Sequence, residues 1–93
     1  MRVVNIANNQ FEVYTDEGVY FQSYDSVVAF KPNNSEEEKI RVGVDWDYSR
    51  TTMKYVGQFL GQNTAKTRRD IKDEVILVDY DLCIGKKSKP LEK

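Results

Sequence analysis

The chain has 93 residues, 40% of them hydrophobic, and its 14 basic and 15 acidic side chains give a net charge of −1. This length predicts a single domain with a small core, and the nearly balanced charge argues against general affinity for nucleic acid. No apolar run reaches the roughly 20 residues that span a bilayer, and a single cysteine, Cys83, excludes an internal disulfide, so we expect a cytoplasmic protein with no membrane partner.

The first third of the chain contains four short β-prone runs, at residues 3–7, 11–15, 19–23 and 27–31. Asn8 and Asn9 suit a tight turn between the first two runs, and Gly18 suits the loop before the third. The runs therefore predict an antiparallel meander. The polar, acidic segment from Pro32 to residue 38 predicts an exposed connector.

One hydrophobic repeat stops and another starts between residues 40 and 60. Apolar and polar side chains alternate over residues 40–48, which predicts a strand antiparallel to residues 27–31, with Trp46 and Tyr48 facing inward. Ser49 is a candidate cap for a helix over residues 49–60, and Gly61 suits its end. The buried stripe of this helix should comprise Met53, Val56, Phe59 and Leu60.

The remaining elements are a second helix and a last strand. Asn63 or Thr64 can cap a short surface helix over residues 65–73, with Ala65 and Ile71 facing inward. Residues 75–84 alternate again, and the inward set would be Ile76, Val78, Tyr80, Leu82 and Ile84. We expect one domain over residues 1–85 and a flexible tail over 86–93.

Together these elements predict an α+β fold. It should be an antiparallel, meander-like sheet of five or six strands, with the main helix packed on one face and the second helix on the surface.

The residue types favour binding over catalysis. The chain lacks histidine, a glycine-rich phosphate loop and any zinc or calcium spacing, so we expect no cofactor, no metal and no enzymatic activity. Cys83 without histidine is a poor nucleophile. One catalytic alternative remains, a Mg²⁺-dependent nuclease whose ligands are two Asp-x-Asp pairs on adjacent strands. The pairs are Asp45 with Asp47 and Asp79 with Asp81.

Charge is divided along the chain. Residues 1–49 contain four basic and nine acidic side chains, whereas residues 50–72 contain six basic and one acidic. Such a division is also typical of an ordinary small protein with two solvated faces, where it has no role in binding. If it is functional, the acidic part would bind a basic groove of a partner protein. The candidate residues are Asp16, Glu17, Asp25, Asp45 and Asp47.

The basic part supports an alternative function, direct binding of nucleic acid, because arginine and lysine neutralise phosphates. The candidate residues are Arg50, Lys54, Lys66, Arg68, Arg69 and Lys72. Exposed tyrosines are a third possible contact, with Tyr14 and Tyr20 the first candidates because they are out of phase with the apolar residues of their strands.

Two stretches carry a resemblance to known proteins. YFQSYDSVVAF at residues 20–30 and WDYSRTTMKYVGQFLG at residues 46–61 resemble a pattern in small uncharacterised proteins encoded by phages and mobile elements of Gram-positive bacteria. The resemblance implies an accessory protein in the cytoplasm of a bacterial host. Such a protein would act by non-enzymatic binding, as an inhibitor of a host or defence protein in the manner of anti-CRISPR proteins.

Overall fold

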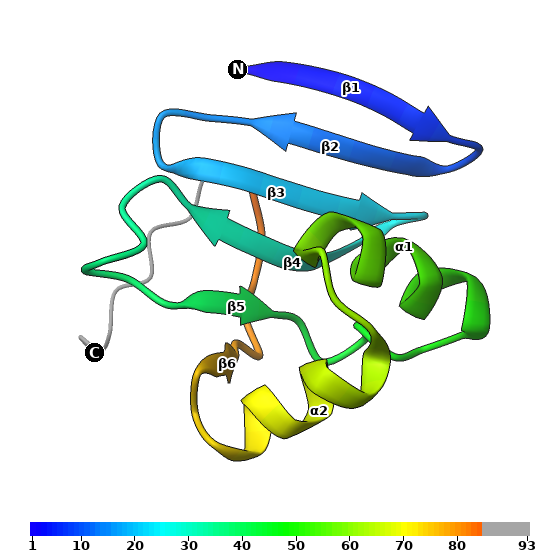
Figure 1. The fold of residues 1–93 in the computed structure, drawn as a ribbon. Helices are drawn as coiled ribbons and strands as arrows, with labels where there is room; N and C mark the ends of the chain where they lie inside the picture. Colours follow the sequence, from blue (N-terminus) through cyan, green and yellow to red (C-terminus); the bar gives the residue numbers. More distant parts are fainter. Residues whose placement is uncertain (85–93) are drawn as a thin grey trace.

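The computed structural model describes residues 1–84, which form a six-stranded sheet with two helices (Figure 1). The strands lie in sequence order across the sheet: β1 (Arg2–Ala7), β2 (Gln10–Tyr14), β3 (Gly18–Ser23), β4 (Ser26–Pro32), β5 (Ile40–Val42) and β6 (Ile76–Val78). The helices are α1 (Arg50–Leu60) and α2 (Thr64–Lys72). This arrangement confirms the α+β fold. The tail expected over residues 86–93 lies outside the described residues.

The predicted meander is confirmed from β1 to β5, where every neighbouring pair is antiparallel. Asn9 has φ +64° in the turn between β1 and β2, as its position in the sequence suggested. A two-residue turn, Tyr24 and Asp25, joins β3 to β4, and Ser23 pairs with Ser26 across it. The exposed connector is also confirmed over residues 33–39, but Pro32 is buried and ends β4.

The strand predicted over residues 40–48 is wrong after Val42. Trp46 N–H donates to the Gly43 carbonyl at 3.2 Å, and Tyr48 N–H donates to the Asp45 carbonyl at 3.0 Å, so the chain makes consecutive turns. Trp46 is buried as expected, but Tyr48 is 78% exposed. The alternation over these residues therefore reflects turns that direct one side chain inward, and not a continued strand.

The last strand is shorter than predicted and pairs differently. β6 lies parallel to β5, and both helices lie in the connection between them. Asp79 N–H still donates to the Val42 carbonyl at 2.8 Å, but the Asp79 carboxylate then accepts from the Asp81 N–H at 2.9 Å. This local turn ends the strand, and Tyr80, predicted to face inward, is 78% exposed.

Both helices begin at the predicted caps. The Ser49 hydroxyl accepts from the Thr52 N–H at 3.1 Å, and the Asn63 side chain accepts from the Lys66 N–H at 2.8 Å. Gly61 has φ +77° at the end of α1. The inward side of α2 differs from the prediction, because Ala65 is exposed and Thr67 is buried in its place. Among residues 1–84, no helix is long and apolar enough to cross a membrane.

The sheet has a buried cluster on each face. The larger cluster lies under the helices and comprises Phe21, Val28, Ala29, Val42, Trp46, Val56, Phe59 and Ile76, with Met53, Leu60 and Ile71 packed against it. The second cluster contains Val13, Tyr20 and Phe30. Leu82 and Ile84 cover it from the segment after β6, which passes behind the sheet in Figure 1. Tyr20 is 0% exposed, so its proposed role as an exposed anchor is wrong.

Candidate binding site

The predicted acidic residues do not form one surface. Asp16 and Glu17 lie in the loop before β3, whereas Asp25 lies in the turn after it. A six-residue strand separates the two groups, which corresponds to roughly 17 Å at about 3.3 Å per residue. Asp45 lies near Asp25, since both line the same two hollows. Asp47 is paired with Arg68 at 3.2 Å.

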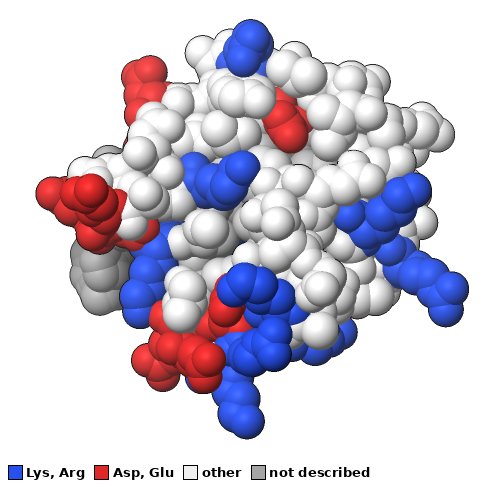
Figure 2. All heavy atoms as spheres, in the orientation of Figure 1, with Lys and Arg blue, Asp and Glu red and all other residues white. Residues whose placement is uncertain are grey.

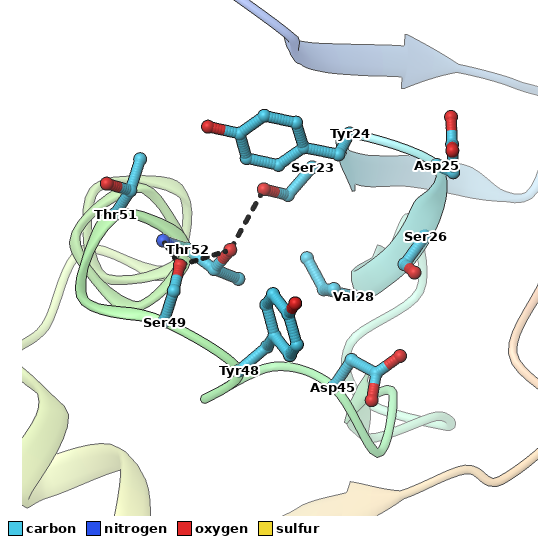
Figure 3. Close-up of a pocket in the computed structure, with 10 residues that line it drawn as sticks. All are labelled: Ser23, Tyr24, Asp25, Ser26, Val28, Asp45, Tyr48, Ser49, Thr51 and Thr52. Carbon is cyan, nitrogen blue, oxygen red and sulfur yellow. Dashed lines mark hydrogen bonds between the residues drawn. The ribbon is translucent and has the colours of Figure 1, made fainter.

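The larger of these hollows, which we call the hairpin–helix pocket, lies between the β3–β4 turn and the start of α1 and has a volume of about 650 Å³ (Figure 3). Its lining residues are Ser23, Tyr24, Asp25, Ser26, Val28, Asp45, Tyr48, Ser49, Thr51 and Thr52. None of them is basic. Among them, Asp25 and Asp45 are acidic residues that the sequence indicated as candidates for binding a partner.

Hydroxyl groups join the two sides of the pocket. Thr52 Oγ1 lies 3.1 Å from Ser23 Oγ of β3, and the cap residue Ser49 donates to the same Thr52 oxygen at 3.2 Å (Figure 3). Ser23 and Thr52 are buried, so these hydrogen bonds are shielded from water. The first turn of α1 is therefore fixed to the β3–β4 hairpin, and the pocket is largely formed before any ligand arrives.

Two tyrosine rings lie on opposite sides of the pocket (Figure 3). Tyr24 is 48% exposed and Tyr48 is 78% exposed, whereas most aromatic side chains of the sheet are covered. Large exposed aromatic rings are frequent anchors of protein interfaces, because they bury a large area with little loss of side-chain freedom. The pocket therefore offers two aromatic surfaces to a ligand.

Tyr24 has an unusual backbone conformation. Its φ is +57°, a left-handed conformation that is rare for a bulky residue. Hydrogen bonds hold it there: Tyr24 N–H donates to the Asn9 carbonyl and the Gln22 side chain donates to the Tyr24 carbonyl, both at 2.8 Å. Strained residues of this kind gather at functional sites, where the surrounding structure maintains them. The two hydrogen bonds thus hold the backbone of Tyr24 beside the pocket.

The pocket carboxylates, like most carboxylates of residues 1–84, form no ion pair. Within residues 1–84, Asp25 and Asp45 form no salt bridge, whereas Asp79 pairs with Arg41 at 3.2 Å. Both also line a smaller hollow of about 250 Å³ that includes Asp79, so they form a ridge between the two hollows. In Figure 3, Asp25 projects from the β3–β4 turn and Asp45 from the loop between β5 and α1. A cation in the pocket would meet negative charge that nothing in this part of the chain neutralises.

The four aspartates of the predicted magnesium site do not come together. Among residues 1–84, no group of three or more histidine, cysteine, aspartate or glutamate residues is placed to hold a metal ion. Asp47 and Asp79 are paired with arginines, and Asp81 is exposed. Cys83 is also exposed. The strand continuations that were expected to align the two pairs are turns.

The predicted basic residues fall into two groups. Figure 2 shows lysine and arginine atoms gathered separately over α1 and over α2. Arg68 has a structural role, because its guanidinium lies 5.0 Å from the centre of the Trp46 ring and pairs with Asp47. Lys66 pairs with Asp70 at 3.1 Å. These contacts partly neutralise the set that would bind nucleic acid.

A model of a family of unknown function, DUF8033, matches residues 1–75. The chain belongs to this family. Searches of curated proteins and of solved structures found no match.

The DUF8033 match includes every residue that lines the hairpin–helix pocket, from Ser23 to Thr52. It ends immediately before β6, so Asp79, Tyr80 and Cys83 of the smaller hollow lie beyond it. The larger pocket is thus built wholly from the part of the chain that defines its membership of DUF8033.

Proposed function

We propose that this DUF8033 protein acts by binding, without catalysis, and that its hairpin–helix pocket receives a basic side chain of a partner protein. The observation that supports this most directly is the pair of carboxylates without an ion pair, Asp25 and Asp45, beside the exposed rings of Tyr24 and Tyr48. A cation held there gains a carboxylate partner and an aromatic face at once.

The partner class follows from the resemblance and the charge. The stretches that resemble phage and mobile-element proteins include most of the pocket residues, which supports a host or defence protein as the partner and the bacterial cytoplasm as the compartment. Proteins that handle nucleic acid expose arginine and lysine in their grooves. If the acidic pocket, flanked by tyrosines, received a basic side chain from such a groove, this protein would cover the groove and inhibit the partner.

The test is capture of a partner from bacterial lysate on the immobilised full chain, with and without nuclease treatment. We expect a protein that nuclease does not release and that Asp25→Lys with Asp45→Lys abolishes. Glu36→Lys with Glu37→Lys is the matched control, since it makes the same change of charge in the exposed connector and should preserve capture. Equal effects of the two double reversals would contradict the pocket as the binding site.

Direct nucleic-acid binding is the second candidate function, favoured by the basic groups on the two helices in Figure 2. The variant that tests it is Arg69→Glu with Lys72→Glu, because reversal of Arg68 would also disturb Asp47 and Trp46. Under this candidate, the protein binds labelled single- or double-stranded DNA or RNA, its affinity falls steeply with salt, and the double reversal abolishes binding. Loss of every captured partner on nuclease treatment would favour this function over the first.

A further inference from the structure

We propose that the cation which the hairpin–helix pocket accepts is an arginine side chain and not a lysine. This inference rests on the proposed function and makes it more specific. It is carried by the chemistry of the lining and by the way in which the chain holds its own arginines and lysines.

The lining offers more acceptors than an ammonium group can use. Besides the two carboxylates, the hydroxyls of Ser26 and Thr51 line the pocket, whereas the Ser49 hydroxyl is already engaged by Thr52. A guanidinium has five N–H donors in one plane and can bond several acceptors while its flat face lies on a ring. An ammonium is compact and strongly hydrated, and it would lose that hydration for fewer contacts. The volume of about 650 Å³ is within the range of ligand pockets and accommodates an arginine with its flanking backbone.

The chain holds two of its five arginines, Arg68 and Arg41, in this manner. Arg68 lies over Trp46 and pairs with Asp47, immediately beside the pocket residues Asp45 and Tyr48. Its guanidinium is 5.0 Å from the ring centre and 3.2 Å from the carboxylate. The pocket lining contains the same two kinds of side chain, an aspartate and an aromatic ring, in Asp45 and Tyr48, and no arginine of residues 1–84 lines it.

Arg41 follows the same pattern on another part of the sheet. It lies 4.7 Å from the centre of the Phe30 ring and pairs with Asp79. The lysines with such contacts are held differently: Lys31 and Lys54 lie over rings without a carboxylate in an ion pair, and Lys66 pairs with Asp70 without a ring. In both places within residues 1–84 where an aromatic ring and an ion-paired carboxylate share one cation, that cation is an arginine.

The test is a titration of the isotope-labelled full chain with three short peptides, followed by backbone amide chemical shifts. The peptides are acetyl-Gly-Arg-Gly-Arg-Gly-amide and its lysine and citrulline counterparts, the last of which keeps the shape without the charge. We expect shifts at residues 23–26 and 45–52, with the arginine peptide binding at least about fivefold more tightly than the lysine peptide. The citrulline peptide should not bind.

Variants test whether the preference for the arginine peptide arises at the pocket. Tyr48→Ala should remove the preference for arginine, and Tyr48→Phe should keep it, because the ring face and not the hydroxyl makes the contact. Tyr80→Ala is the control, since Tyr80 is also 78% exposed but lines only the smaller hollow. Both tyrosines are largely outside the core, so these variants should fold.

The outcomes separate the two proposals. Equal binding of the arginine and lysine peptides at the pocket would overturn the arginine inference and leave a cation-binding pocket. Binding of the citrulline peptide as tight as that of the arginine peptide would overturn the role of charge. No shift at the pocket with any peptide, or shifts only elsewhere, would overturn both proposals.

Discussion

Ser23 and Thr52, 29 residues apart in the sequence, join their side-chain hydroxyls at 3.1 Å inside the protein and tie the β3–β4 hairpin to the first turn of α1. Thr52→Val removes this hydrogen bond and the one from the Ser49 hydroxyl with little change of shape, and it leaves the Ser23 hydroxyl buried without its partner on α1. We expect a loss of about 1–3 kcal/mol in the free energy of unfolding, measured by urea denaturation. Thr51→Val, at an exposed neighbour, should cost less than about 0.5 kcal/mol.

A double-mutant cycle gives the corresponding control. Adding Ser23→Ala to Thr52→Val removes both partners, so the double variant should lose less stability than the sum of the single variants. Strictly additive losses would contradict a shared hydrogen bond between the hairpin and the helix.

Phe59 connects α1 to the sheet. Its ring stacks on Phe21 with 5.5 Å between the centres, and the residue is 5% exposed. Phe59→Ala should therefore lower the free energy of unfolding by about 3–5 kcal/mol. Tyr48→Ala removes a ring of similar size from the surface and should have little effect on the same measurement. A loss below about 1 kcal/mol for Phe59→Ala, well under the cost of a buried ring, would be inconsistent with this packing.

Gln10 is a polar residue in a costly position. It is 0% exposed, it pairs with Ser23 in the register of β2 and β3, and neither its amide nitrogen nor its amide oxygen has a hydrogen-bond partner among residues 1–84. Gln10→Met keeps the length of the side chain and removes both polar atoms. Because a buried polar group without a partner costs about 1–3 kcal/mol, this variant should be more stable by a similar amount. A decrease in thermal stability would show that the amide is hydrogen-bonded in solution.

The parts of the fold that sequence predicted well depend on short-range signals. Ser49 and Asn63 cap their helices through bonds to residues three positions away, and Asn9 and Gly61 adopt the positive φ expected of them. The hairpins of the meander join neighbouring strands for the same reason. The helical stripe was also predictable, because Val56 and Phe59 are buried at the spacing of one helix face.

The wrong predictions concern residues whose structure depends on contacts with parts of the chain that are distant in the sequence. The alternation of residues 43–48 looked like a strand, but turns place Trp46 in the core and leave Tyr48 outside. Tyr20 was expected at the surface because the second cluster, which Leu82 helps to cover, could not be foreseen. The parallel pairing of Ile40 with Ile76 likewise depends on how the two helices return the chain.

Only part of the candidate site could be predicted from the sequence, for a related reason. Asp25 and Asp45 could be selected by their charge, but their grouping with Tyr24, and their separation from Asp16, depend on which end of β3 each occupies. No local pattern reports that geometry. The one signal that could have helped is the Ser23-Tyr24-Asp25-Ser26 turn, which places a tyrosine where a two-residue hairpin loop usually has glycine or asparagine.

Two glycines with positive φ should respond differently to alanine. Gly61 has φ +77° with open space around it, so Gly61→Ala should cost only the left-handed conformation, about 1–2 kcal/mol. At Gly18 a Cβ would collide with the Lys31 carbonyl oxygen and lie 2.9 Å from the Phe30 ring. Gly18→Ala should therefore cost about 1–3 kcal/mol more, as overpacking does. Thermal denaturation of the two variants side by side checks the order, and a milder effect at Gly18 would contradict it.

The last prediction concerns the contribution of Asp70 to stability at low pH. A hydrogen bond from Lys66, and a second from Gln62, hold the pKa of the Asp70 carboxyl below its ordinary value of 3.8. Because the folded pKa is the lower one, these contacts stabilise the fold above pH 3.8, and the contribution is lost as the pH falls from there through the folded pKa. Asp70→Asn should thus be less stable than the natural chain at pH 7.

The difference in the free energy of unfolding between Asp70→Asn and the natural chain should narrow as the pH falls below about 4, where the unfolded carboxyl also takes up a proton. Urea denaturation at pH 7, 5, 4 and 3 measures it, and between pH 7 and 5 it should stay constant. In a Lys66→Met background the difference at pH 7 should shrink, because the first cause of the lowered pKa is gone. A difference that stays the same from pH 7 to pH 3 would show that Asp70 contributes to folding through its shape and not through its charge.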